Sequence, residues 1–386
     1  MPAGALDGVV VADFSRVLAG PYATMLLGDL GAHVIKVERP GSGDDTRSWG
    51  PPWRGAQSTY FASVNRNKDS VVIDLASEEG RGQARALAVR ADVVVQNFKP
   101  GAFPRMGLDY ETLKEQNPGL VYCSISGFGT GAGAELPGYD LLVQAVGGLM
   151  SVTGHSPDHP VKVGVALVDV ITGLHAAVGV LAALNERSRS GRGQHVEVNL
   201  LSSLLSGMVN QSSGYVGADF VPSIMGNRHP SIAPYESYPT ADTPIVIAVG
   251  NDRQFRACAE VLGCPAWADD PRFVTNPARV RHRAELFDLM CERLRTQGAE
   301  EWFAALSVVG VPAGPIHDMA GAFALAERLG LSPVAHVDGE PTVANPITLS
   351  RTPVSYRSAP PELGNVTLPV DGPVVDGPRP DRGAGR

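Results

Sequence analysis

The chain has 386 residues, 44% of them apolar, with a formal net charge of −8 and an isoelectric point near 5.6. This length favours two domains, or one large domain with an insertion. The acidic balance argues against a general nucleic-acid binder or a protein of anionic membrane surfaces. No uncharged apolar run of about 18 residues is evident, and the N-terminus lacks the pattern of a signal peptide. We therefore expect a cytoplasmic protein without a membrane span.

Short apolar strands alternate with helical patterns through the first half of the chain. Strands are expected at 9–14, 32–38, 71–75, 92–96, 120–126 and 195–199, with helices at 19–30, 77–90, 169–187 and 200–209. Such alternation indicates a mostly parallel sheet with helices on both faces. The expected fold class is therefore α/β, with a large domain built on this sheet.

A change of character follows at residues 215–235, which are punctuated by glycine and proline. Beyond them we expect a strand at 244–249 and helices at 254–262, 282–295 and 300–308. We assign a small domain to 225–325 and a large domain to 1–215 together with 330–386. The tail from Asp371 to Arg386 is rich in proline, glycine and charge, and is expected to be mobile.

Asp169 is the single acid in the apolar segment 161–173, where a strand-like run gives way to a helical pattern. Burial of an unpaired carboxylate is costly and raises its pKa, so a group of this kind is a candidate for chemistry. A second interpretation stays open at this point. Aspartate is a favoured helix N-cap, and a cap contributes about 1 kcal/mol by itself.

Several common motifs are absent from the sequence. There is no P-loop, no His-Glu-x-x-His helix and no Gly-x-Ser-x-Gly elbow, and the four cysteines fit no zinc pattern. The turn after the first strand, residues 15–21, lacks Gly-x-Gly-x-x-Gly, which disfavours a nicotinamide enzyme. We expect neither a metal nor a nicotinamide cofactor. Residues 127–133 are glycine-rich without opening a helix, and favour a flexible loop.

Basic and amide side chains follow successive strands of the expected sheet. Arg16 follows the first strand, Arg39 the second and Asn97 the fourth, with Arg105 shortly beyond. Loops at the carboxyl ends of parallel strands form the ligand crevice of such sheets. Because arginine makes bidentate contacts with phosphate, this placement favours a phosphorylated ligand.

The chain resembles the class III CoA-transferases, the CaiB/BaiF family, from Leu6 to about residue 355. The resemblance lies in several separate motifs in order: residues 13–21, 27–41, 97–101, 138–144, the Asp169 segment, 190–194, 226–230, 269–273 and 310–315. It implies an open Rossmann-like large domain, a smaller inserted α+β domain and an interlocked homodimer. It also implies coenzyme A as substrate and product, with an acyl-CoA and a small carboxylic acid as partners.

The resemblance further implies roles for individual residues. Asp169 matches the catalytic nucleophile. The implied CoA-binding residues are Arg16, Val17, Leu18, Arg39, Ile73, Asp74, Leu75, Asn97, Phe98, Arg105 and Met106. The implied substrate-side loop residues are Gly127, Tyr139, Gly226, Asn227 and His229.

Two departures from related patterns bear on function. The family often has a lysine where this chain has Ala76, so Lys68, Lys99 or Arg16 are the candidates to replace a phosphate contact. A 2-methylacyl-CoA racemase, which shares this fold, has a histidine where this chain has Tyr139. Tyrosine is a poor base near neutral pH, so the sequence favours a CoA-transferase. A racemase and a non-catalytic CoA-binding protein are the alternatives.

Overall fold

The computed structural model describes residues 4–367, which form two compact units. Among the described residues, the first unit comprises 4–149, 163–220 and 332–367, and the second comprises 150–162 and 221–331. The expected large domain, 1–215 with 330–386, differs from this division at residues 150–162 and 330–331, which belong to the second unit; residues 154–160 form a small hairpin there. The tail expected to be mobile, residues 371–386, lies outside the described residues.

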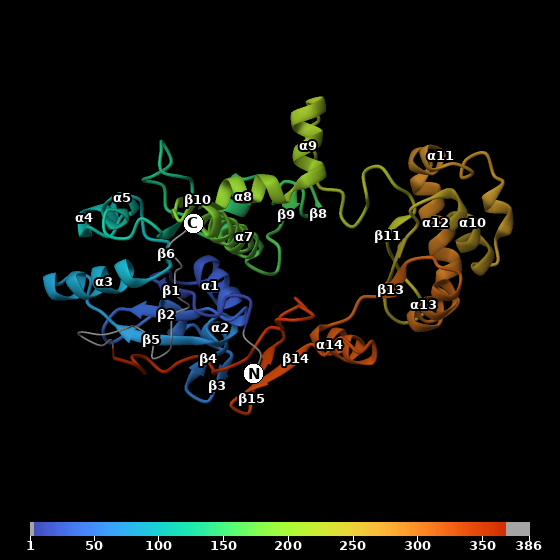
Figure 1. Ribbon diagram of the computed structural model, residues 1–386. Coiled ribbons are helices and arrows are strands. Elements are labelled where there is room, and N and C mark those ends of the chain that lie inside the picture. The colour runs from blue at the N-terminus through green and yellow to red at the C-terminus, as the bar shows by residue number, and fades with distance from the viewer. Residues whose placement is uncertain (1–3, 368–386) are drawn as a thin grey trace. The chain divides into compact units, whose positions relative to one another are not determined.

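A six-stranded parallel sheet forms the centre of the first unit, with strand order β10-β7-β6-β1-β2-β5 (Figure 1). The strands are β1 (Val10–Asp13), β2 (His33–Glu38), β5 (Lys68–Val72), β6 (Val93–Gln96), β7 (Val121–Ser126) and β10 (His195–Asn199). From β1 the sheet is extended on one side by β2 and β5, and then on the other side by β6, β7 and β10. Ligands of open α/β sheets bind at such a switch point, here between β1 and β6. The expected parallel α/β sheet is confirmed.

Helices cover both faces of this sheet. On one face lie α1 (Ala19–Asp29), α6 (Asp140–Val146), α7 (Leu167–Ser190) and α8 (Leu200–Gly207), and on the other α3 (Glu78–Arg90), α4 (Ala102–Met106) and α5 (Tyr110–Lys114). The unit also contains α2 (Thr59–Ser63), α9 (Val209–Ala218), which has no buried residue, and a 3-10 turn at Asp45–Ser48. Alternate residues of β1 face opposite cores: Val11 packs with α1, α7 and α8, while Ala12 packs with α3, α4 and α5. Because successive side chains of a strand point to opposite faces of the sheet, β1 contributes to the hydrophobic cores on both faces.

Two short hairpins complete the first unit. They are β3 (Trp53–Arg54) with β4 (Gln57–Ser58), and β14 (Val334–Val337) with β15 (Glu340–Val343). The C-terminal segment runs back along the sheet: Asn67 donates its main-chain N–H to the carbonyl of Ser358 at 3.0 Å, and Asn345 donates to Asp29 at 2.8 Å. Both ends of the chain therefore build the same unit.

Helix α7 is the longest helix of the first unit. It ends at Gly191, whose φ of 71° suits the left-handed position after a helix. By length and composition alone, α7 is apolar enough to cross a membrane, with a mean hydropathy of 2.0 over its most apolar 18 residues. Of these residues, 39% are buried. Core helices pass the same test, and α7 packs on α1, β7, β10 and α8.

The second unit combines a three-stranded antiparallel sheet with helices. Its strands are β11 (Tyr235–Tyr238), β12 (Ile245–Ala248) and β13 (Ala313–Pro315), and the hairpin pairs β8 (Gly154–Ser156) with β9 (His159–Pro160). Its helices are α10 (Asp252–Val261), α11 (Asn276–Arg281), α12 (Arg283–Leu294), α13 (Ala299–Val308) and α14 (Met319–Arg328), with a 3-10 turn at Pro265–Ala268. Ile247, Phe255 and Met290 lie in its separate buried core. This is the expected α+β architecture.

Candidate active site

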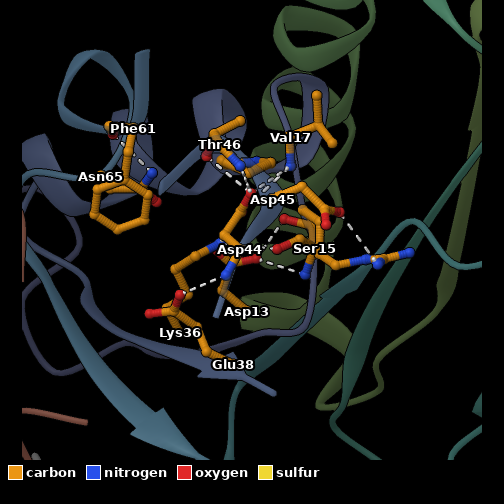
Figure 2. Close-up of polar contacts among 12 residues, drawn as sticks. Asp13, Ser15, Val17, Lys36, Glu38, Asp44, Asp45, Thr46, Phe61 and Asn65 are labelled. Atoms are coloured by element: carbon orange, nitrogen blue, oxygen red, sulfur yellow. Dashed lines mark hydrogen bonds and ion pairs between the residues drawn. The ribbon is translucent and has the colours of Figure 1, made fainter. Parts of the chain in front are cut away.

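Two buried ion pairs lie behind the loop that follows β1. Lys36 Nζ lies 2.8 Å from Asp44 Oδ2 (Figure 2). Lys68 Nζ lies 3.0 Å from Asp13 Oδ2, and all four side chains are inaccessible to solvent. Burial opposes the charge of Asp13, yet the neighbouring lysines hold the pKa of its carboxyl below the usual range. A buried charge is tolerated when it is paired and hydrogen-bonded. These paired side chains can therefore support the loop from inside the protein.

The loop itself, residues 15–18, is held in an uncommon conformation. Val17 has a φ of 70°, which is unfavourable for a β-branched residue. Its N–H donates to both carboxylate oxygens of Asp44 at 3.3 Å, and Lys36 donates to the carbonyl of Ser15 at 3.0 Å (Figure 2). The buried ion pairs therefore impose the shape of this loop, which leads into α1.

A cavity of about 300 Å³ opens in front of this loop and contains Asp169. Segments that are far apart in the sequence line it: the loop after β1, the end of β6, the end of β7, the turn before α6 and the start of α7. Its lining residues include Arg16, Val17, Leu18, Asn97, Phe98, Lys99, Gly127, Tyr139 and Asp169.

A second cavity of about 230 Å³ in the same unit shares Arg16 and Phe98 with the first. Arg39, Ile73, Asp74, Leu75 and Ala76 also line it. The guanidinium of Arg16 lies 5.0 Å from the centre of the Phe98 ring, and Asp45 pairs with both Arg16 and Arg39.

The Nε of Arg16 is a candidate for contact with a ligand. It is buried and makes no hydrogen bond to any residue that the structure describes. A buried donor without a partner is unusual. At the junction of the two cavities, it could donate to an anionic group.

Asp169 occupies the third position of α7, not its N-cap. Ala166 is the N-cap and provides no side-chain hydrogen bond, so the capping interpretation of Asp169 is wrong. The Asp169 carboxylate makes no hydrogen bond to a residue within 4–367, which leaves it free to face the cavity. Burial, and then the negative charge of Asp140, raises its pKa to about 7. A substantial fraction of this carboxylate is therefore protonated near neutral pH.

Two further groups interact with Asp169, and of these the sequence analysis assigned no role to Asp140. Asp140 Oδ2 accepts hydrogen bonds from the N–H groups of Val168 at 2.8 Å and Asp169 at 3.2 Å. Burial, and then the charges of Asp169, Asp140 and Asp44, raises the pKa of Tyr60 to about 12. The sequence could not reveal the role of Asp140, because spacing along the chain carries no signal for a contact between the starts of two helices.

Comparison with known proteins decides the family. The family model described as CoA-transferase family III matches residues 6–367. This chain belongs to CoA-transferase family III.

Named relatives agree over most of the chain. The succinate–glutarate CoA-transferase of Agrobacterium fabrum is 42% identical, covering 93% of each chain. The human succinyl-CoA:glutarate CoA-transferase is 40% identical over 95% of this chain and 85% of that protein. The acetyl-CoA:oxalate CoA-transferase of Acetobacter aceti is 39% identical over 90% of each. The chain is therefore an enzyme that transfers CoA between an acyl-CoA and a carboxylic acid.

Solved structures of the family share the fold. A CaiB/BaiF family protein from Brucella suis has a TM-score of 0.85 and 42% identity, covering 94% of this chain and 97% of that one. Rv3272 from Mycobacterium tuberculosis has a TM-score of 0.86 and 30% identity, covering 94% and 98%.

The two cavities of this CoA-transferase bring together most, but not all, of the residues expected at the site. Arg105 and Met106 lie on α4 and line neither cavity, and Arg105 is exposed. Gly226, Asn227 and His229 belong to the second unit, where Asn227 donates to Ser237 at 2.8 Å.

The candidates to replace the lysine absent at Ala76 have different positions. Lys68 cannot serve, because it is buried in its pair with Asp13. Lys99 lines the first cavity and lies 2.5 Å from Glu135. Arg16 lines both cavities. Within residues 4–367 no group of three or more metal-ligating side chains is found.

Proposed function

We propose that this CoA-transferase carries the acyl group and then CoA covalently on Asp169. The observation that carries the proposal is a carboxylate without a hydrogen-bond partner among the described residues, in a cavity with Arg16 and Phe98, whose pKa is raised to about 7. A desolvated carboxylate held near a thioester is a better nucleophile than one in water.

In the first half-reaction, the Asp169 carboxylate attacks the thioester carbonyl carbon. The C–S bond breaks, the electron pair leaves with CoA thiolate, and a mixed anhydride remains on Asp169. The thiolate then attacks the aspartyl carbonyl carbon, the anhydride C–O bond breaks, and the donor acid leaves as a carboxylate. The enzyme now holds an aspartyl-CoA thioester.

The second half-reaction reverses these steps with the acceptor. Its carboxylate attacks the aspartyl thioester and expels CoA thiolate, which then attacks the acceptor's carbonyl carbon in the new anhydride. Acyl-CoA leaves and the Asp169 carboxylate is restored. Because one thioester replaces another without net proton or electron transfer, we propose that neither a metal nor a nicotinamide takes part.

We propose that CoA extends from the second cavity into the first. Arg39, Ile73, Asp74 and Leu75 would contact the adenine and phosphate end, while Asn97 and the loop 16–18 would hold the pantetheine arm. Support comes from the arginines at the junction and from Phe98, whose ring offers an apolar surface between the cavities. By resemblance, Arg105 and Met106 remain assigned to CoA binding.

Gly127 and Tyr139 of the first unit are proposed as acid-side residues, together with Gly226, Asn227 and His229 of the second. Gly127 lines the cavity that contains Asp169, and main-chain N–H groups of its glycine-containing loop would stabilise the oxyanion. Because the relatives named above act on succinate, glutarate or oxalate, we propose a short dicarboxylic acid as acceptor. Assays of succinyl-CoA and acetyl-CoA against glutarate, oxalate and a monocarboxylate panel would test this.

The decisive experiment removes the nucleophile. D169N keeps the size of the side chain but cannot form an anhydride, so we expect exchange to fall by at least about 10³-fold, the order of loss typical of a missing nucleophile. Wild-type enzyme mixed with acyl-CoA and hydroxylamine should yield a hydroxamate at Asp169, detected by peptide mass spectrometry. Exchange at the wild-type rate in D169N would refute covalent catalysis by Asp169.

The two alternatives have their own tests. A racemase would take deuterium from heavy water into Cα of a chiral 2-methylacyl-CoA without acyl exchange; we expect no uptake, since Tyr139 stands in the cavity where racemases have histidine. A non-catalytic CoA-binding protein would bind CoA yet leave no adduct on Asp169.

We further propose that the enzyme is a cytoplasmic homodimer with interlocked subunits. Beside the resemblance, large apolar side chains on the first unit support this, since exposed apolar patches often mark interfaces. They are Leu141 and Val146 of α6, Leu174 and Val178 of α7, Leu205 of α8, and Val209 and Val216 of α9. Light scattering should give twice the chain mass of 40.5 kDa; a monomer at micromolar concentration would contradict the proposal.

A further inference from the structure

The first turn of α7 receives its cap from another helix. An N-cap side chain ordinarily accepts hydrogen bonds from the second or third N–H of its helix, but Ala166 has no acceptor to offer. Asp140, the first residue of α6, accepts from these two groups, the N–H of Val168 at 2.8 Å and of Asp169 at 3.2 Å. The orphan donors of α7 are thus satisfied without the side chain of Asp169.

The second oxygen of Asp140 is also held. Gln144 donates to it from Nε2 at 2.5 Å, and Gln144 Oε1 accepts the N–H of Val163 at 2.9 Å. Gln144 is fully buried, so its orientation is restricted by packing. These bonds hold the start of α6, the start of α7 and the segment that enters α7 in fixed positions relative to one another.

We propose that Asp140 is a positioning residue for CoA transfer: it fixes the main chain that carries Asp169 and places a negative charge beside the nucleophile. This inference rests on the proposed role of Asp169. Asp140 needs no contact with substrate, since it acts through the peptide group of Asp169. The capping geometry directs the Asp140 carboxylate at α7 and leaves the Asp169 carboxylate in the cavity.

The charged surroundings of Asp169 make this role measurable. After burial, Asp140 is the group that raises the pKa of Asp169. Tyr60 of α2 is coupled to Asp169 and stays neutral, since its own pKa is about 12. The remaining titratable groups on elements packed against α7 are Tyr22 and Asp29 of α1, Tyr122 and Cys123 of β7, and His195 and Glu197 of β10, with none on α8. None of these contributes to the shift of Asp169.

Two variants separate the cap from the charge. D140N keeps an oxygen that can accept from the N–H groups of Val168 and Asp169, but removes the charge. We expect the acid limb of its pH–rate profile to move to lower pH by on the order of one unit, because a like charge nearby disfavours ionisation. D140A removes cap and charge, and we expect kcat to fall by on the order of tenfold or more through misplacement of Asp169, with the KM for acyl-CoA changed less.

A matched control comes from another capping aspartate of the same unit. Asp109 caps α5 by accepting from the N–H of Thr112 at 3.1 Å, and it lines neither cavity. D109N should lose comparable stability and leave the pH profile unmoved. The positioning role is overturned if folded D140N keeps the wild-type acid limb. Should D140A fail to fold, D140N still decides. An active D169N would instead overturn the nucleophile, whatever D140N does.

Discussion

The carboxamide of Asn97 bonds both main-chain polar groups of Arg16. Asn97 Oδ1 accepts the N–H of Arg16 at 2.9 Å, and Nδ2 donates to its carbonyl at 2.7 Å. Asn97 directly follows β6 and Arg16 lies three residues after β1, and these strands are parallel neighbours. The amide thus ties the carboxyl ends of two strands together at the mouth of the cavity that contains Asp169.

We expect N97A to weaken acyl-CoA binding more than it slows the chemistry. Loss of two hydrogen bonds, each contributing about 1 kcal/mol, should free the loop and raise the KM for acyl-CoA by roughly tenfold to thirtyfold, with a smaller change in kcat. N117A is a matched control, since Asn117 also bonds two main-chain carbonyls, of Val89 and Ala91, but lines neither cavity. An equal rise of KM in both variants would contradict the role of Asn97.

The rate of CoA transfer should fall in mild acid. Attack requires the ionised Asp169, whose pKa is raised to about 7, so kcat/KM should lose about a factor of ten for each pH unit below 7. Initial rates of succinyl-CoA consumption between about pH 5 and 9 would measure this, with circular dichroism checking that the fold persists. A flat profile down to pH 5 would show that Asp169 ionises normally.

Asp169 should also make the fold less stable as pH rises. The folded-state pKa, about 7, lies above the reference value of 3.8, so between these pH values the folded chain binds more protons than the unfolded chain. Its free energy of unfolding therefore falls as pH rises through this range. D169N has no such charge. Its free energy of unfolding should exceed that of wild type at pH 8 by on the order of a few kcal/mol, with little difference near pH 4. Urea titrations at both pH values would test this; a difference independent of pH would refute it.

Periodic patterns in the sequence were sufficient to predict the sheet and most of its helices, because burial on a pleat or a helical face leaves a regular spacing. The strand expected at 71–75 lies instead at Lys68–Val72. The pattern could not show this, since the strand begins with a lysine that is buried only because Asp13 neutralises it. The same ion pair removed Lys68 from the candidates for a phosphate contact.

The sequence could indicate a candidate site residue where the residue type alone suggests its chemistry. It could not indicate a residue whose role depends on a contact with a distant part of the chain. Asp169 stood out as an acid in an apolar segment. Asp140 did not, because its function arises from N–H groups that are 28 and 29 residues further along the chain. A close approach between two backbone segments is equally invisible in the sequence, as Gly127 and Gly138 illustrate.

We expect G138A to impair catalysis without unfolding the protein. A Cβ at Gly138 would lie 2.5 Å from the Cα of Gly127, so the two strands of the loop would have to separate beside Tyr139 and Asp140. Displacement of this kind near a reacting group can cost up to about 10²-fold, and we expect kcat to fall by at least tenfold. G131A is the control, because a Cβ there meets nothing within 4 Å. Similar kcat values for the two variants would exclude the close approach as a requirement.

The buried ion pair of Lys68 and Asp13 supplies a test of the loop's foundation. K68M leaves Asp13 buried and unpaired, and removal of one partner from such a pair typically costs 3–5 kcal/mol. We expect a loss of about that size in the free energy of unfolding, measured by urea titration at pH 7. The double variant D13N/K68M should recover much of it, because the amide can still accept from Thr24, whose hydroxyl lies 2.6 Å from Asp13. K114M, which breaks the exposed pair with Glu111, should have no measurable effect. If K68M proves as stable as K114M, the buried pairs do not hold the loop in place.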